Sequence, residues 1–253
     1  MAQEENRDAE AREEARLVVD FIHRLAMHHA MWFERVRESL GPEEAWKALG
    51  EAWGKSLGIQ TQRLGKTLGF ELADGIPKPL LDLPPAKLRA LREAIAANWL
   101  ATDGVWFQAV EGARGMEAAK ACNDACWARF SPFEAWSIRR LLGLPERPGL
   151  EGLRKALGLR LYATLNRQSF AEETPSSLVF RMDDCRVQSA RKRKNLPDYP
   201  CKSGGLVEYA SFAEAIDPRI RTECVGCPPD AHPAEWYCAW KFTLGGGGER
   251  AVF

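Results

Sequence analysis

The sequence carries no excess of charge and no long apolar run. Its 35 Lys and Arg residues balance its 35 Asp and Glu residues. General nucleic-acid-binding proteins are usually basic, so this balance argues against a nucleic-acid partner. No apolar run reaches the roughly 18 residues that a membrane-spanning helix needs. Residues 1–16 are acidic and polar, unlike a signal peptide. We therefore expect a cytoplasmic protein with no membrane partner.

Common catalytic and nucleotide-binding motifs are also missing. The sequence contains no G-x-S-x-G, no P-loop and no G-x-G-x-x-G. It has only four histidines, and no H-E-x-x-H pattern joins them into a metal centre. These absences argue against a serine hydrolase of the α/β type, a P-loop enzyme, a dinucleotide-dependent enzyme and a histidine-based metalloprotease.

Cysteine is missing from the first 121 residues but frequent near the end of the chain. Five of the seven cysteines lie between Cys185 and Cys238. An odd number of cysteines in a chain without a secretion signal argues against a disulfide framework. Metal binding or thiol chemistry is the better expectation for this segment.

The strongest motif is Cys224-Val-Gly-Cys227, a C-x-x-C sequence. Its two-residue spacer lets both thiolates bind one soft ion, and Cys185 and Cys201 are candidates for the other two ligands. Four thiolates suit Zn²⁺ or an Fe–S cluster, and the sequence does not decide between them. Two alternatives stay open: a redox or nucleophilic dithiol, and reduced cysteines that pack as small apolar groups.

Two further residues are candidates for a catalytic role. Cys238 alternates with Trp240 and Phe242 on one face of an expected strand, where its thiol can face a pocket or simply pack in the core. Asp184 precedes Cys185 and can act as a general base or orient a water molecule. Capping of the helix that follows is the alternative role of Asp184.

The first 150 residues are expected to be helical and internally duplicated. Apolar residues recur at helical spacing, and a segment around Trp32-Phe33 matches one 74 residues later around Trp106-Phe107. The two copies span about residues 8–76 and 82–150. Duplicated helical units can bury their apolar faces against each other in a pseudo-symmetric bundle.

The repeat suggests a ligand pocket at its symmetry interface. His28 and His29 precede Trp32 by about one helical turn, and polar Asp103 stands where His29 stands, just before Trp106. Polar groups beside paired aromatic rings are typical of a small-molecule pocket, so His28, His29, Trp32 and Trp106 are candidate ligand-binding residues. Exposed or core histidines are the alternative.

After residue 150 the composition changes to that of a small α+β module. Strands are expected at residues 159–165, 177–182, 219–224 and 236–244, with helices at 185–194 and 205–215 between them. The chain is thus predicted to be α+β, with a duplicated helical bundle at 1–150 and a small, cysteine-rich antiparallel-sheet module at 151–253.

The cysteine-rich segment resembles a group of uncharacterised cytosolic proteins of bacteria and archaea. The resemblance lies in a C…C…C-x-x-C-P…C-x-W-x-F arrangement, here Cys185, Cys201, Cys224-Val-Gly-Cys227-Pro228 and Cys238-Ala-Trp240-Lys-Phe242. The segment is more distantly similar to the L-2-amino-thiazoline-4-carboxylic acid hydrolase family and the 4-vinyl reductase domain. Those distant similarities imply a small-molecule pocket, with hydrolysis of a C–N bond or ligand sensing as its use.

These observations together predict a cytoplasmic protein that binds Zn²⁺ or an Fe–S cluster and has a small-molecule pocket. A hydrolase-like activity on an unknown substrate is one use of such a pocket. The alternative is a non-catalytic sensor or interaction module in which the cysteine site is only structural.

Overall fold

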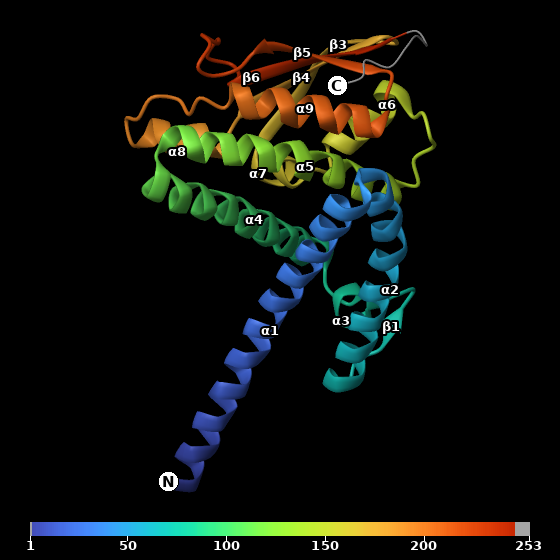
Figure 1. Cartoon of the computed structure of the whole chain (residues 1–253), viewed down its shortest axis with the longest axis vertical. Helices are drawn as coiled ribbons and strands as arrows, with labels where there is room; N and C mark the ends of the chain where they lie inside the picture. The colour runs from blue at the N-terminus through green and yellow to red at the C-terminus, as the bar shows by residue number, and fades with distance from the viewer. Residues whose placement is uncertain (1, 246–253) are drawn as a thin grey trace. The chain divides into compact units, whose positions relative to one another are not determined.

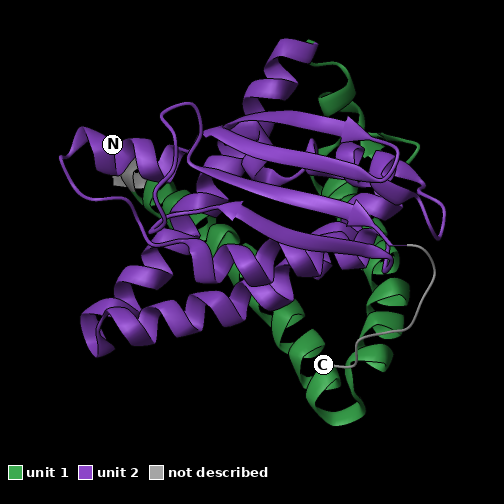
Figure 2. Ribbon diagram, turned by 90° about the horizontal axis from the view of Figure 1, so that it is seen from above, with its two compact units in different colours: residues 1–84 green, residues 85–253 purple. Residues whose placement is uncertain are grey.

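The chain folds into two compact units that divide between Pro84 and Pro85. The computed structural model describes residues 2–245 (Figure 1). Unit 1 covers residues 1–84 and unit 2 covers residues 85–253 (Figure 2). The division falls close to the start of the second predicted repeat, so nearly all of that repeat shares a unit with the cysteine-rich segment. The predicted α+β class is confirmed.

Unit 1 is a long helical hairpin followed by a two-stranded hairpin and one helical turn. Its elements are α1 (Ala2–Leu40), α2 (Pro42–Leu68), β1 (Leu72–Ala73), β2 (Ile76–Pro77) and α3 (Lys78–Leu81). Gly41 turns the chain between the two long helices at a φ of 89°, which glycine adopts without steric cost. Pro42 occupies the first turn of α2, where no intrahelical N–H bond is lost.

Unit 2 begins with a second helical hairpin and continues into the sheet. Its elements are α4 (Pro85–Arg114), α5 (Met116–Leu142), α6 (Gly149–Leu157), α7 (Leu161–Leu165), β3 (Arg167–Thr174), β4 (Ser177–Asp184), α8 (Arg186–Arg193), α9 (Lys202–Ile216), β5 (Ile220–Gly226) and β6 (Cys238–Leu244). The hairpin turns at Gly115 with a φ of 85° and ends at a left-handed Gly143, the counterparts of Gly41 and Gly69.

The sheet of unit 2 is antiparallel, in the order β3-β4-β6-β5. Helix α9 packs against it, α5 packs against α9, and α4 packs against α5, so the unit is layered (Figure 1). No described helix has the length and apolar character needed to cross a membrane.

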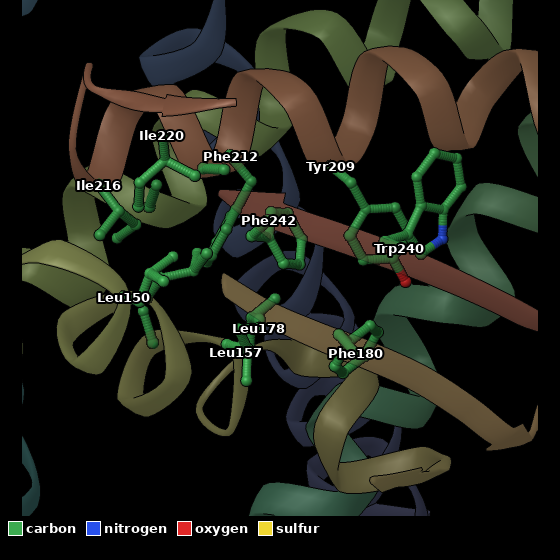
Figure 3. Packing of buried hydrophobic residues seen from close by; sticks show 14 of the residues in the cluster. Leu150, Leu157, Leu178, Phe180, Tyr209, Phe212, Ile216, Ile220, Trp240 and Phe242 are labelled. Atoms are coloured by element: carbon green, nitrogen blue, oxygen red, sulfur yellow. The ribbon is translucent and has the colours of Figure 1, made fainter. Parts of the chain in front are cut away.

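The core of unit 2 lies between α9 and the sheet (Figure 3). Trp240 and Phe242 on β6 are fully buried, and Cys238 shares their face, as the alternation predicted. The Tyr209 ring stacks on Trp240 at a centroid distance of 4.7 Å. Gly205 allows this approach, since a Cβ atom there would lie 2.5 Å from the Trp240 ring.

One predicted strand is wrong. Residues 161–165 form the short helix α7, and the edge strand β3 begins only at Arg167. The carboxylate of Glu134 on α5 accepts a hydrogen bond from the Leu161 backbone N–H at 2.8 Å, at the first residue of α7. A partner distant in sequence therefore satisfies a helix N-terminus that the alternating pattern did not reveal.

Candidate functional site

A cavity of about 390 Å³ lies inside unit 2, among α4, α5, α8 and α9. Its wall combines aromatic rings, charged side chains and two thiols. The aromatic residues are Phe107, Trp127, Tyr162 and Tyr199. The charged residues are Asp103, Glu111, Lys120, Arg191 and Glu208, and the thiols are those of Cys185 and Cys201.

The aromatic rings form two rigid pairs. Trp127 on α5 stacks on Tyr162 of α7 with a centroid distance of 5.5 Å and an interplanar angle of 12°. Phe107 on α4 meets Tyr199 edge to face at 5.6 Å. Such rings offer flat apolar surfaces without much mobility, a usual property of small-molecule pockets.

Two polar groups on α4 and α5 face the same cavity. Asn123 donates a hydrogen bond from Nδ2 to Asp103 Oδ1 at 3.2 Å. Burial raises the pKa of the Asp103 carboxyl above its ordinary value. Lys120 pairs with Asp124 at 3.2 Å, and its ammonium lies 5.0 Å from the centre of the Tyr199 ring.

A buried charge cluster supports the wall behind Glu208. Arg160 is 2% exposed and pairs with Glu134 at 2.8 Å and with Glu208 at 2.7 Å. Its guanidinium also lies 4.7 Å from the centre of the Phe212 ring. Burial disfavours the charged form of Arg160, but the two carboxylates outweigh it and raise its pKa. Burial likewise raises the pKa of Glu208.

The structure brings two of the four predicted metal ligands into direct contact. Cys201 precedes α9, and its Sγ lies 3.5 Å from Sγ of Cys227, which follows β5. Cys185 lines the cavity beside Cys201, whereas Cys224 lies within β5, opposite Trp240 in the sheet register. Within residues 2–245, no group of three or more His, Cys, Asp or Glu side chains is arranged to hold a metal ion.

The contact between Cys201 and Cys227 shifts the pKa values of the two thiols in opposite directions. Hydrogen bonds from Cys227 and from Gln188 Nε2 outweigh partial burial and lower the pKa of Cys201. The same contact raises the pKa of Cys227. Of these two thiols, Cys201 on the cavity wall is therefore the one that ionises more readily. Burial raises the pKa of Cys185 to about 12.

The two catalytic candidates occupy different places. Asp184 is exposed at the end of β4, where it accepts a hydrogen bond from the Ser189 hydroxyl. Cys238 is buried in β6 and interacts with Cys227. Of the residues whose positions the structure describes, neither of these two lines the cavity.

The four residues of the predicted pocket are divided between the units. His28 and Trp32 lie together on α1, with ring centroids 6.4 Å apart, and His29 meets Trp53 of α2 at 5.6 Å. Trp106 belongs to α4 of unit 2. There it lines a second cavity of about 280 Å³ along α4 and α5, together with Asp103.

The pair Cys122 and Cys126 also lines the second cavity. Their counterparts in the first copy are Ala48 and Ala52, and small residues on one helix face are typical of close helix packing. Both cysteines are exposed instead. Small side chains at these positions therefore do not mark a tight contact between buried helix faces.

Sequence reasoning missed most of the polar wall of the main cavity. The repeat contained a signal for it, because Lys120 and Asn123 stand where the first copy has Trp46 and Leu49. Replacement of apolar residues by polar ones on a helix that remains buried indicates an internal polar site. Glu208 and Arg160 lie outside the repeat and had no such signal.

Comparison with known proteins identifies a family. No curated protein and no solved structure matches the chain. The family of unknown function DUF6125 matches residues 81–244, more than half of the chain, which include α4 through β6 and therefore the cavity and the cysteines around it. The chain thus belongs to the family DUF6125.

Proposed function

We propose that unit 2 binds a small molecule in the 390 Å³ cavity. The observation that carries the proposal is the placement of Asp103 and Asn123 among four aromatic rings. The volume falls within the roughly 300–1,000 Å³ of ligand pockets, and such pockets combine apolar walls with a few polar groups that orient the ligand.

The lining indicates a ligand with a flat apolar body and a cationic or hydrogen-bond-donating nitrogen. Trp127 and Phe107 supply faces for stacking. Three acidic and two basic side chains line the cavity, and Lys120 and Glu208 already pair with Asp124 and Arg160. The remaining lining charge is negative, which favours a cation beside Asp103.

Binding is compatible with catalysis and with sensing. The expected distant similarity to the thiazoline carboxylic acid hydrolase family and the 4-vinyl reductase domain would place a small molecule in the same half of the chain. A cytoplasmic setting suits cysteines that stay reduced. We do not extend the proposal to Zn²⁺ or an Fe–S cluster, because the described side chains form no metal-ligating group.

Calorimetric titration of the purified full chain with tryptamine tests the proposal. Tryptamine combines a flat ring with an ammonium group, whereas indole lacks the charge and indole-3-acetate reverses it. We expect measurable binding in the order tryptamine, indole, indole-3-acetate, and an affinity for tryptamine about tenfold lower in Asp103→Asn.

Glu38→Gln on α1 is the matched control, because Glu38 is an exposed carboxylate of unit 1 that pairs with Arg35 at 3.5 Å. We expect this variant to bind tryptamine like the unaltered chain. Absence of binding for all three probes at millimolar concentration, or equal affinity in Asp103→Asn, would contradict the proposal.

A further inference from the structure

Two segments far apart in sequence hold Cys201 and Cys227 together. Their sulfur atoms lie 3.5 Å apart. Lys202, which follows Cys201, donates its backbone N–H to the carbonyl of Pro228, which follows Cys227, at 2.9 Å. The Lys202 ammonium pairs with Asp230 at 2.7 Å. Backbone and side-chain contacts thus fix the start of α9 against the loop after β5.

We propose that Cys201 and Cys227 form a redox-active dithiol that exchanges with low-molecular-weight disulfides, such as glutathione disulfide, at the cavity wall. The inference uses the cavity of the proposed function as the route of access, but it does not depend on an aromatic ligand. Closing the disulfide shortens the sulfur separation by about 1.5 Å, from 3.5 Å to about 2.05 Å.

The two cysteines have different access to a reactant. Cys201 is half-buried and lines the cavity, whereas Cys227 is 1% exposed. Cys201 is therefore the attacking residue, and Cys227 reacts only afterwards, with Sγ of Cys201 in the mixed disulfide. This division between an accessible and a buried thiol is the arrangement in which a mixed disulfide is resolved internally.

The exchange takes place in two balanced steps. In the first, the Cys201 thiolate attacks one sulfur of the small disulfide, forms a mixed disulfide and releases one small thiolate. In the second, Cys227 attacks Sγ of Cys201, the protein disulfide forms, and the second small molecule leaves with the Cys227 proton as a thiol. The protein dithiol loses two electrons, and the small disulfide gains them.

The wall around the dithiol is held by hydrogen bonds that do not all involve sulfur. Gln188 donates from Nε2 to Cys201 Sγ at 3.5 Å. Gln188 also donates to the Tyr199 carbonyl at 2.9 Å and accepts from the Tyr199 N–H at 2.8 Å. These two backbone contacts hold the segment before Cys201 without involving either sulfur atom.

The structure selects a different partner for Cys227 from the one that the C-x-x-C motif indicates. The motif would pair Cys227 with Cys224, the usual arrangement of a redox dithiol within one turn. In the fold, Cys224 lies in register with Trp240 inside the sheet, and Cys227 meets Cys201 and Cys238. The inference therefore predicts a disulfide between residues 201 and 227.

Equilibration of the full chain with glutathione redox buffers, followed by alkylation, intact mass measurement and peptide mapping, tests the inference. We expect the oxidised chain to carry two fewer alkyl groups than the reduced chain, with two hydrogen atoms lost to the disulfide, and the map to show a Cys201–Cys227 cross-link. Cys201→Ser and Cys227→Ser should both lose the cross-link. Cys227→Ser should in addition accumulate a stable mixed disulfide with glutathione at Cys201.

Cys224→Ser, Cys238→Ser and Cys122→Ser are the matched controls, and each should keep the Cys201–Cys227 cross-link. A cross-link between residues 224 and 227 or between 227 and 238, or seven thiols that all remain alkylatable in the most oxidising buffer, would overturn the inference. Should a variant fail to fold by circular dichroism, the peptide map of the unaltered chain still decides. Failure of tryptamine to bind would leave this result untouched, so the two proposals fail separately.

Discussion

The hairpins α1–α2 and α4–α5 are two copies of one sequence pattern, yet they differ in how much of their surface is buried. Both turn at a glycine of positive φ, Gly41 and Gly115. Helix α2 buries Ala45, Leu49 and Gly65. Helix α5 buries twice as many residues: Ala119, Trp127, Ser131, Glu134, Ala135 and Ile138. The repeated pattern therefore specifies a hairpin, while contacts with α7 and α9 specify how deeply α5 is buried.

The copies also differ in what faces inward. Ala45 and its counterpart Ala119 are both 1% exposed, so part of the inner face is shared. Beside it, Lys120 and Asn123 replace Trp46 and Leu49 and line the cavity. Polar residues at these two positions thus distinguish the hairpin that carries the candidate site from its copy.

Trp127 and Trp53 occupy equivalent positions in the two hairpins. Substituting each of them is the strongest test of the difference in burial between α5 and α2. Trp127 is 5% exposed and stacks on Tyr162, whereas Trp53 is half-buried and meets His29. We expect Trp127→Ala to lower the free energy of unfolding by about 4 kcal/mol and Trp53→Ala by about 1.5 kcal/mol. Hydrogen exchange of α5 and α2 peptides measures the two effects separately.

Equal losses of protection in the two helices would contradict the claim that contacts outside the repeat bury α5 more deeply. Far-UV circular dichroism before the exchange experiment establishes that both variants keep their helices.

Glu134 and its counterpart Gln60 test the buried charge cluster. Glu134→Gln introduces the residue of the first copy opposite Arg160. Among the described residues, Glu208 then remains as the ionic partner of Arg160. Because an incompletely paired buried charge is costly, we expect Glu134→Gln to lower the free energy of unfolding, measured with urea, by about 3 kcal/mol. The reciprocal Gln60→Glu should change stability by less than about 0.5 kcal/mol, since Gln60 is only half-buried.

If Glu134→Gln lowers the free energy of unfolding by less than about 1 kcal/mol, Glu208 by itself is enough to pair the charge of Arg160. The charge cluster would then not be what holds α5 to the rest of unit 2.

Asp217 makes a smaller, pH-dependent contribution to the stability of unit 2. It is fully buried, and hydrogen bonds from Arg219, with further bonds from the Arg219 and Gly149 backbone, lower its pKa to about 2. Because the folded pKa lies below the unfolded value of 3.8, this stability is complete above about pH 4 and is lost as the pH falls towards 2.

Allowing for screening at Arg219, which is 32% exposed, we expect the contribution to be about 1.5 kcal/mol. Asp217→Asn should therefore flatten the fall in stability between pH 4 and pH 2, measured by urea unfolding. Glu43→Gln, which removes an exposed pair with Lys47 in unit 1, should leave that fall unchanged. An unaltered slope in Asp217→Asn would contradict the assignment.

Much of the secondary structure was predictable because it depends on local spacing. Helical periodicity indicated the helices of the first hairpin, and the alternation of Cys238, Trp240 and Phe242 indicated a strand with one core face. The strand prediction for residues 161–165 was wrong because apolar and polar residues alternate there as in a strand. The carboxylate that stabilises their helical turn belongs to Glu134 of α5, which is distant in sequence.

The candidate site was predictable only in part. The clustering of cysteines identified Cys201 and Cys227 as candidate site residues. The C-x-x-C spacing, however, predicted Cys224 as the nearest partner of Cys227. Spacing along a chain describes neighbours in sequence, whereas the sheet register carries Cys224 to a place opposite Trp240. Asp103, Lys120 and Glu208 come from three different helices, and no local pattern connects them.

The amino-acid sequence alone specified the duplicated hairpins, the α+β class and the concentration of thiols after residue 184, because propensity, turns and periodicity act over a few residues. The tertiary structure decided which thiols meet, which hairpin is buried and where a cavity opens. Those outcomes depend on contacts between distant segments, such as Arg160 with Glu134 and Lys202 with Pro228. Burial and electrostatic pairing depend on distances in space, and the order of residues along the chain does not give those distances directly.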